Sequence, residues 1–261
     1  MKKINFMSVL PDIPLVLTIA GFDPSGCAGI LADIKTFETN GVYGMAVCTA
    51  NTEQNVTGFK KPNWIKKEEI IAQLNLLQKE VNFEFVKIGL VESFEVLQIL
   101  VNELIKANPD VKIVWDPICK ASAGFEFHTD VENGLLESIC SRLFMVTPNL
   151  DELNMFSSIG EIEEAGRHLA QYCNFLIKGG HSTTEYSTDI LFTKPGTYYF
   201  EAAKLEGFSK RGTGCVLSAA IVANLAKGES LVQTVANAKR YINSYLTSNR
   251  SMVGTHSFEN Q

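Results

Sequence analysis

Short apolar segments alternate with segments of helical periodicity along most of the 261-residue chain. A helix from about residue 28 carries Ile30, Ile34 and Phe37 on one face, and further helices are expected at about 66–81, 93–107, 214–226 and 230–247. Buried strands are expected at 16–20, 43–50, 85–89, 111–117, 143–149 and 175–180, with a hairpin that joins 189–193 to 198–202. Such alternation predicts an α/β fold in which a central, mostly parallel β-sheet is covered by helices on both faces.

The chain is expected to form one domain. No internal repeat, linker or low-complexity segment interrupts the alternation, and 46% of the residues are hydrophobic, enough for one large core. We therefore treat 1–261 as a single domain, with 1–14 and 248–261 peripheral and the polar tail from Ser248 frayed.

Composition and charge narrow the function classes. The net charge is −6, with 23 basic and 29 acidic residues and no long basic run, so no nucleic-acid partner is expected. No apolar run approaches the roughly 20 residues that span a bilayer, and a proline-broken segment after Lys3 argues against a secretory signal. The six cysteines form no C-x-x-C pair, which favours reduced thiols and a cytoplasmic protein without zinc.

Polar and glycine-rich clusters follow the expected strands at their carboxyl ends. They lie at 21–29, 52–58, 116–124, 147–152 and 178–181. Ligands of open α/β sheets bind beyond these ends, so we expect the clusters to meet in one ligand site.

The first cluster has the G-x-x-x-x-G spacing of a phosphate-binding P-loop, between Gly21 and Gly26. A true P-loop continues with Lys and then Ser or Thr, which reach the phosphates and Mg²⁺. Here Cys27 and Ala28 follow. This loop is therefore not expected to hold a nucleotide phosphate.

A better phosphate site is the run Gly212-Thr213-Gly214-Cys215, which opens a long alanine-rich helix. Glycines let successive backbone N–H groups converge, and a helix N-terminus adds about half a positive charge. We expect an anion hole there, with Lys178 as a counter-charge. A simple turn before a buried helix, and an ordinary exposed lysine, are the alternatives.

Seven blocks in register resemble the hydroxymethylpyrimidine/phosphomethylpyrimidine kinases of thiamine biosynthesis, which belong to the ribokinase-like superfamily. The blocks are LTIAGFDPSGCAGILADIKTF, GVYGMAVCTANTEQNVTG, KIG, DPI, TPNLDE, IKGGH and GTGCVLSAAIVANLAKG. They run from about Leu15 to Leu246. The resemblance implies a ribokinase-like sandwich, ATP and Mg²⁺ as cofactors, a homodimer, and a pyrimidine alcohol and its monophosphate as substrates.

The resemblance also assigns the acceptor pocket. Asp33 matches a residue that hydrogen-bonds the pyrimidine, and Gln54 matches a glutamine that reads the amino and ring-nitrogen edge, which needs both a donor and an acceptor. A solvated Asp33 and a plain loop residue at 54 are the alternatives. The remaining pocket residues implied by the resemblance are Ala28, Thr52, Leu90 and Ile118.

At the phosphate end, Asn149 and Glu152 match the N-x-x-E motif that organises Mg²⁺, and Asp116 lies near the metal and phosphates. Lys178 would touch the transferred phosphate, together with the run from Gly212 to Cys215. The resemblance makes Cys215 the base for the hydroxymethyl proton, where many relatives carry Asp. A helix N-terminus favours its thiolate and nearby phosphates oppose it, so its protonation stays open. A buried structural cysteine is the alternative.

Some positions depart from the family pattern. Arg211 stands where histidine is common, Ser122 where a lysine is usual, and Phe22 where a small polar residue is usual. A pyridoxal kinase on the same scaffold is thus the first alternative, although Gram-positive kinases of that kind tend to lose the glutamine at position 54. A non-catalytic ligand-binding protein is the second.

Overall fold

The computed structural model describes residues 12–119, 127, 133–179, 186–205 and 207–257. The segment around Lys3, the position of Ser122 and the end of the cluster at 178–181 lie outside these residues. The elements are β1 (Leu15–Phe22), α1 (Gly29–Thr39), β2 (Tyr43–Gln54), β3 (Phe59–Trp64), α2 (Lys67–Gln78), β4 (Phe85–Ile88), α3 (Phe94–Ala107), β5 (Lys112–Trp115), α4 (Asn133–Cys140), β6 (Met145–Val146), α5 (Leu150–Phe156), α6 (Ile162–Leu169), β7 (Asn174–Ile177), β8 (Tyr186–Thr193), β9 (Gly196–Ala203), α7 (Thr213–Ala226) and α8 (Leu231–Thr247).

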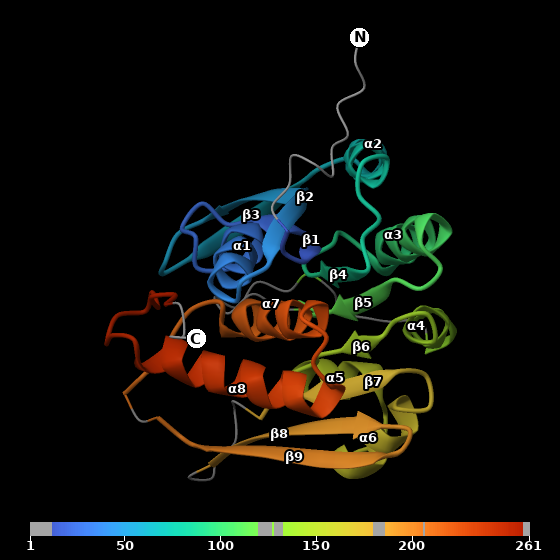
Figure 1. The fold of residues 1–261 in the computed structure, drawn as a ribbon. Helices are drawn as coiled ribbons and strands as arrows, with labels where there is room; N and C mark the ends of the chain where they lie inside the picture. Colours follow the sequence, from blue (N-terminus) through green and yellow to red (C-terminus); the bar gives the residue numbers. More distant parts are fainter. Residues whose placement is uncertain (1–11, 120–126, 128–132, 180–185, 206, 258–261) are drawn as a thin grey trace.

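The strands form one sheet in the order β3-β2-β1-β4-β5-β6-β7-β8-β9 (Figure 1). The middle of the sheet, from β2 to β7, is parallel, while β3, β8 and β9 pair antiparallel at the edges. The mostly parallel α/β sheet predicted from the sequence is confirmed, and so is the hairpin, which is longer at both strands.

Alternate residues of the central strands pack into two separate cores. In β1, Leu17 and Ile19 join one core while Val16 joins the other, and in β5 Ile113 and Val114 divide in the same way. Successive side chains of a strand point to opposite faces, so each face must be covered. Helices α2 to α6 supply the first core, and α1, α7 and α8 supply the second (Figure 1).

The structure adds elements that the periodicity did not predict. Strand β3, with the sequence FKKPNW, is largely polar and contains Pro62, as suits an edge strand that presents one side to solvent. The short helices α4, α5 and α6 had no individual prediction. The strand expected at 143–149 reduces to two residues, because the chain turns at Pro148 into α5.

The expectation of a frayed tail is wrong for residues 248–257. The buried ammonium of Lys210 donates to oxygens of Asn249 and Ser251. Tyr241 also bonds His256, which ties this segment to α8. Among the residues described here, none of the helices is long and apolar enough to cross a membrane.

Candidate active site

The predicted clusters meet at the carboxyl edge of the sheet, around a cavity of about 250 Å³. The strand order reverses beside β1, since the chain runs from β1 to β2 on one side and later places β4 on the other. Such a switch point is where α/β sheets bind ligands. The cavity is lined by Gly21, Asp23, Ser25, Cys27, Ala28, Gly29, Thr52, Gln54, Asn55, Phe59, Leu90, Asp116, Ile118, Phe127, Asn149, Glu152, Lys178, Arg211, Gly212, Thr213, Gly214 and Cys215.

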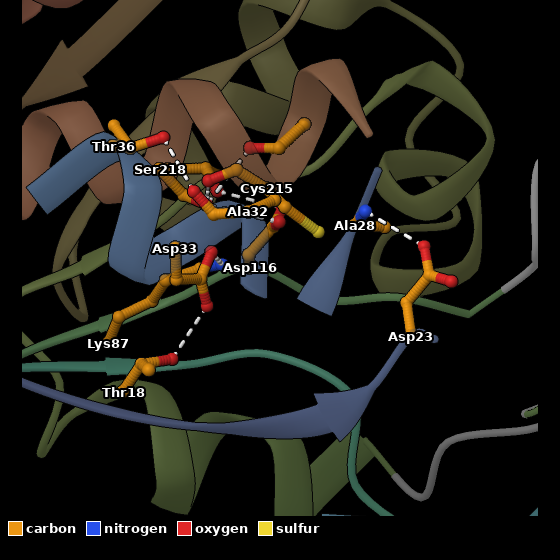
Figure 2. Close-up of polar contacts among 12 residues, drawn as sticks. Thr18, Asp23, Ala28, Ala32, Asp33, Thr36, Lys87, Asp116, Cys215 and Ser218 are labelled. Atoms are coloured by element: carbon orange, nitrogen blue, oxygen red, sulfur yellow. Dashed lines mark hydrogen bonds and ion pairs between the residues drawn. The ribbon is translucent and has the colours of Figure 1, made fainter. Parts of the chain in front are cut away.

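The loop that resembles a P-loop is filled by its own carboxylate. Asp23 accepts hydrogen bonds from the backbone N–H groups of Ser25 (2.8 Å) and Cys27 (3.2 Å), and from Ala28 (2.9 Å; Figure 2). The hydroxyl of Ser25 adds a fourth bond, at 2.7 Å. These donors are therefore committed within the loop, which explains physically why its glycine spacing does not make a phosphate cradle.

The second glycine run lies at the start of α7 and lines the cavity. Gly212 caps α7 in a left-handed conformation (φ 73°), and a Cβ there would lie 1.8 Å from the carbonyl oxygen of Cys27. Only glycine combines this φ with such a close approach. The run thus places the N-terminus of α7 directly against the first loop, at the edge of the cavity.

Gly214, unlike Gly212, does not have a positive φ. A Cβ at Gly214 would lie 3.5 Å from Lys178 Nζ and 3.8 Å from Asp116 Oδ2, which is ordinary contact. A side chain at this position would therefore project toward the charged side chains of the cavity rather than strain the backbone.

A charged cluster faces the start of α7. Lys178 Nζ lies 2.8 Å from Asp116 Oδ1 and 3.8 Å from Glu152 Oε2. Burial lowers the pKa of Lys178, but the two carboxylates raise it more, so the net pKa is raised. Burial raises the pKa of Asp116, but the charges of Lys178 and Lys87 lower it by more, so the net pKa is below its ordinary value. The cluster therefore presents an ammonium and an ionised carboxylate at neutral pH.

Asn149 and Glu152 form a reciprocal capping box at the start of α5. Asn149 Oδ1 accepts from the Glu152 N–H at 2.9 Å, and Glu152 Oε2 accepts from the Asn149 N–H at 2.8 Å. Burial raises the pKa of Glu152. The pair has a clear structural role in ending the strand and starting the helix. Since both side chains also line the cavity, the structural and the ligand-binding interpretations coexist.

Cys215 lies in the first turn of α7, with 6% of its surface exposed to the cavity. Burial raises the pKa of its thiol to about 11, against the opposing charge of Lys87. The question of protonation that the sequence left open is thus resolved in favour of a neutral thiol at neutral pH.

Asp33 does not reach the cavity, so the prediction that it contacts a ligand directly is corrected. Its side chain is fully buried, accepts a 2.6 Å hydrogen bond from Thr18 Oγ1 and pairs with the ammonium of Lys87 (Figure 2). Burial lowers the pKa of Lys87, but Asp33, Cys215 and Asp116 raise it, and the net pKa is raised. A lysine in the middle of the apolar run FVKI was the sequence signal that a buried partner must exist.

The other end of the cavity is more apolar. Leu90 and Ile118 line it as predicted, and Thr52 and Gln54 lie on β2 rather than in a loop. Gln54 Nε2 donates to Thr52 Oγ1 at 2.8 Å, and that hydroxyl donates to the Phe22 carbonyl at 2.8 Å. This chain of hydrogen bonds fixes the orientation of the amide.

Sequence reasoning missed two side chains that line the cavity, Phe59 and Phe127. The two phenylalanine rings meet edge to face with centroids 5.2 Å apart. Nothing in the local pattern marks Phe59, since β3 itself was not expected. The acidic residue in the first loop was visible in the sequence, but its bonding to the loop was not.

The oxygen donors of the cavity suit a hydrated Mg²⁺ ion. Among the described residues no group of three or more potential ligands from His, Cys, Asp and Glu gathers in one place. Asp116 and Glu152 supply two carboxylates, both already hydrogen-bonded. This set fits a cation that keeps most of its waters and binds mainly to phosphate oxygens, as Mg²⁺ commonly does.

Comparison with known proteins decides the family. The family model described as phosphomethylpyrimidine kinase matches residues 23–259. The chain belongs to this family. A hydroxymethylpyrimidine/phosphomethylpyrimidine kinase from Aquifex aeolicus is 33% identical over 250 residues, covering 91% of this chain and 96% of the relative. As a member of the phosphomethylpyrimidine kinase family the protein is a phosphotransferase, as the sequence predicted.

Solved structures agree on the scaffold of the phosphomethylpyrimidine kinase family. A phosphomethylpyrimidine kinase from Clostridium difficile is 32% identical, with a TM-score of 0.75, covering 88% of this chain and 98% of that one. A pyridoxal kinase from Bacillus subtilis, solved as an ADP complex, is 26% identical, with a TM-score of 0.82, covering 95% of this chain and 98% of that one. The predicted ribokinase-like fold is confirmed, and both kinase types share it.

Proposed function

We propose that the protein transfers the γ-phosphoryl group of ATP to the hydroxymethyl oxygen of 4-amino-5-hydroxymethyl-2-methylpyrimidine, and then phosphorylates the resulting monophosphate. In the first step the bond between the hydroxymethyl oxygen and γ-phosphorus forms, the bond from γ-phosphorus to the bridging oxygen breaks, and the hydroxyl proton is released. The observation that carries this proposal is one cavity with two chemically different ends. An oriented amide and apolar walls form one end, and a helix N-terminus with an ammonium forms the other.

The acceptor end suits a planar, amino-bearing heterocycle. Gln54 offers a donor and an acceptor to a ring edge that needs both, and Leu90 and Ile118 offer apolar contact to its faces. Phe59 adds an aromatic surface. Ala28 and Thr52 complete this end, while Asp33 supports it from behind by holding α1 to β4 through Lys87.

The phosphate end suits a polyphosphate. The N–H groups from Gly212 to Cys215 and the ammonium of Lys178 would stabilise the charge that spreads over the transferred group. Asp116, Asn149 and Glu152 would hold Mg²⁺ through its waters. Bound there, Mg²⁺ would neutralise phosphate charge.

Cys215 would not receive the hydroxyl proton in this scheme, and the proton would pass to a phosphate oxygen or to water. A thiol with a pKa of about 11 is protonated in the resting enzyme, so a preformed thiolate base does not fit this site. Phosphoryl transfer has a loose transition state and relies mainly on positioning and charge stabilisation. We therefore assign Cys215 to packing beside the acceptor hydroxyl, with the anion hole providing most of the catalysis.

Pyridoxal phosphorylation is the second candidate function. The similarity to the Bacillus subtilis pyridoxal kinase supports it, since the TM-score to that structure is 0.82, against 0.75 for the phosphomethylpyrimidine kinase structure. Gln54 favours the pyrimidine, because pyridoxal has no ring amino group to pair with the amide. A homodimer in solution remains part of the proposal, by family resemblance.

One assay separates these functions. Purified protein is given ATP and Mg²⁺ with the pyrimidine alcohol, its monophosphate or pyridoxal, and ADP release is followed through a coupled reaction. We expect the highest kcat/KM with the pyrimidine alcohol and turnover of its monophosphate. A preference for pyridoxal would overturn the substrate assignment, and ADP release from none of the three would overturn the proposed reaction.

A further inference from the structure

The segment 249–257, which we call the C-terminal strap, folds back after α8 toward α1 and α7 (Figure 1). It contacts the loop that carries the anion hole, two residues before Gly212. Lys210 is the centre of this contact, and only 8% of its surface is exposed.

The ammonium of Lys210 is surrounded by strap oxygens. Lys210 Nζ donates to the Asn249 carbonyl at 2.5 Å, to Asn249 Oδ1 at 2.8 Å and to the Ser251 carbonyl at 2.6 Å. A lysine ammonium has three N–H donors, so these contacts satisfy it completely. The positive charge thereby closes a turn of the strap and fixes the turn to the loop.

A second hydrogen bond joins the same two segments. The N–H of Arg211 donates to the Met252 carbonyl at 3.0 Å. Two consecutive residues of the loop are thus bonded to the strap, immediately before the cradle. Arg211 itself already lines the cavity.

The strap is in turn anchored on α8. A Cβ at Gly254 would lie 2.3 Å from the ring of Tyr245, so the strap backbone packs closely against that ring. His256 Nδ1 lies 2.9 Å from the Tyr241 hydroxyl, which also bonds Thr39 of α1 at 2.6 Å. The strap therefore connects the loop to two helices of the second core.

The opposite side of the loop is held just as closely. Gly212 approaches the carbonyl of Cys27 so tightly that no side chain fits between them. The glycine-rich loop thus lies between the first loop of the cavity and the strap. Glycines give a loop many conformations. A phosphate cradle, however, needs its N–H groups held to within about 0.5 Å of their productive positions.

We propose that Lys210 is a positioning residue for phosphoryl transfer, which clamps the C-terminal strap against the anion-hole loop and fixes the N–H groups from Gly212 onward. Lys210 touches no substrate in this scheme. The inference rests on the proposed function, because it assigns that loop to the transferred phosphate.

The test compares Lys210→Met with a chain that ends at Ser248, under saturating ATP and Mg²⁺. Methionine keeps most of the side-chain length but donates no hydrogen bonds. A displacement of about 1 Å at a catalytic group can cost roughly 100-fold. We expect kcat to fall at least about 10-fold in each variant, with the KM for the acceptor within about threefold of wild type. The truncation removes all the strap contacts, including those of Lys210, so adding Lys210→Met to the truncated chain should cost little more than the truncation alone.

Lys227→Met is the matched control, because Lys227 is an exposed lysine at the other end of α7. It should keep wild-type kcat. Circular dichroism and the melting temperature check folding, with kcat measured well below each melting temperature. Should Lys210→Met fail to fold, Asn249→Ala, which removes only the Oδ1 acceptor, should give a smaller loss in the same direction.

A merely stabilising contact would lower the melting temperature and leave kcat within about twofold of wild type, and this result would overturn the proposal. Losses that multiply in the combined variant would also overturn it, since they would mean that Lys210 and the strap act independently. Calorimetric binding of the ATP analogue AMP-PCP needs no acceptor. If the wild type bound the analogue but phosphorylated no pyrimidine, the substrate assignment alone would fail, and weaker analogue binding by Lys210→Met would still support the clamp.

Discussion

Replacing Gly212 by alanine should reduce catalysis as well as stability. The backbone at this residue is left-handed (φ 73°), and a Cβ would lie 1.8 Å from the Cys27 carbonyl oxygen. The left-handed conformation alone costs a residue with a side chain about 1–2 kcal/mol. The overlap with a backbone oxygen cannot be relieved by a rotamer change, so the two loops must separate.

The size of that movement sets the expected effect on the rate. Real Cβ atoms essentially never lie closer than 3.0 Å to such an atom, so the loops must move apart by at least about 1.2 Å. Because a misplacement of about 1 Å costs on the order of 100-fold, we expect kcat of Gly212→Ala to fall by roughly two orders of magnitude. The same movement would widen the cavity between the acceptor and the phosphate cradle.

Gly228→Ala provides the matched control for Gly212→Ala. Gly228 follows the C-terminal end of the same helix and also has a positive φ (84°), but a Cβ added there would meet nothing within 4 Å. It should lose stability by about 1–2 kcal/mol and keep wild-type kcat. Both variants are measured by denaturant unfolding and by ADP release with the pyrimidine alcohol. If folded Gly212→Ala kept more than about a third of wild-type kcat, the close approach would not shape the phosphate site, and the reasoning would be refuted.

Three other outcomes are expected. Gln54→Met should lower kcat/KM for the pyrimidine alcohol about 5- to 150-fold, since an unmade buried hydrogen bond costs about 1–3 kcal/mol, while pyridoxal activity is spared; equal losses for both would assign Gln54 to the fold. Asn149→Ala should raise the Mg²⁺ concentration that gives half-maximal rate, whereas Ser230→Ala, which removes the cap of α8 in the same way, should not; an unchanged Mg²⁺ titration in the first variant would contradict a metal role. Burial lowers the pKa of His256 to about 4, below its unfolded value near 6.5, so this group contributes stability that is present above about pH 6.5 and is lost as the pH falls toward 4. The melting temperature should therefore drop over that range, and a drop of the same size in His256→Phe would exclude this cause.

The order of the elements and the edge that binds ligand could be predicted from the sequence. Short apolar segments mark strands such as β1 and β5, and helical periodicity marks α3. Parallel strands bring their carboxyl ends to one edge, so clusters as distant as Thr52 and Lys178 could be expected to meet. The glycine run at the start of α7 could also be located from the sequence, since the proposed anion hole is formed by four consecutive residues, Gly212 to Cys215.

Only the tertiary structure decided which of these polar groups face the ligand. Asp33 turns from the cavity because Lys87, 54 residues away, needs a counter-charge in the core. Asp23 occupies the loop that resembles a P-loop because its carboxylate satisfies the N–H groups there. The tail lies against Lys210 because a buried ammonium requires hydrogen-bond acceptors, and Asn249 and Ser251 supply three oxygens. Sequence periodicity records which face of an element is apolar, whereas the partner of a buried charge depends on segments that meet only when the chain has folded.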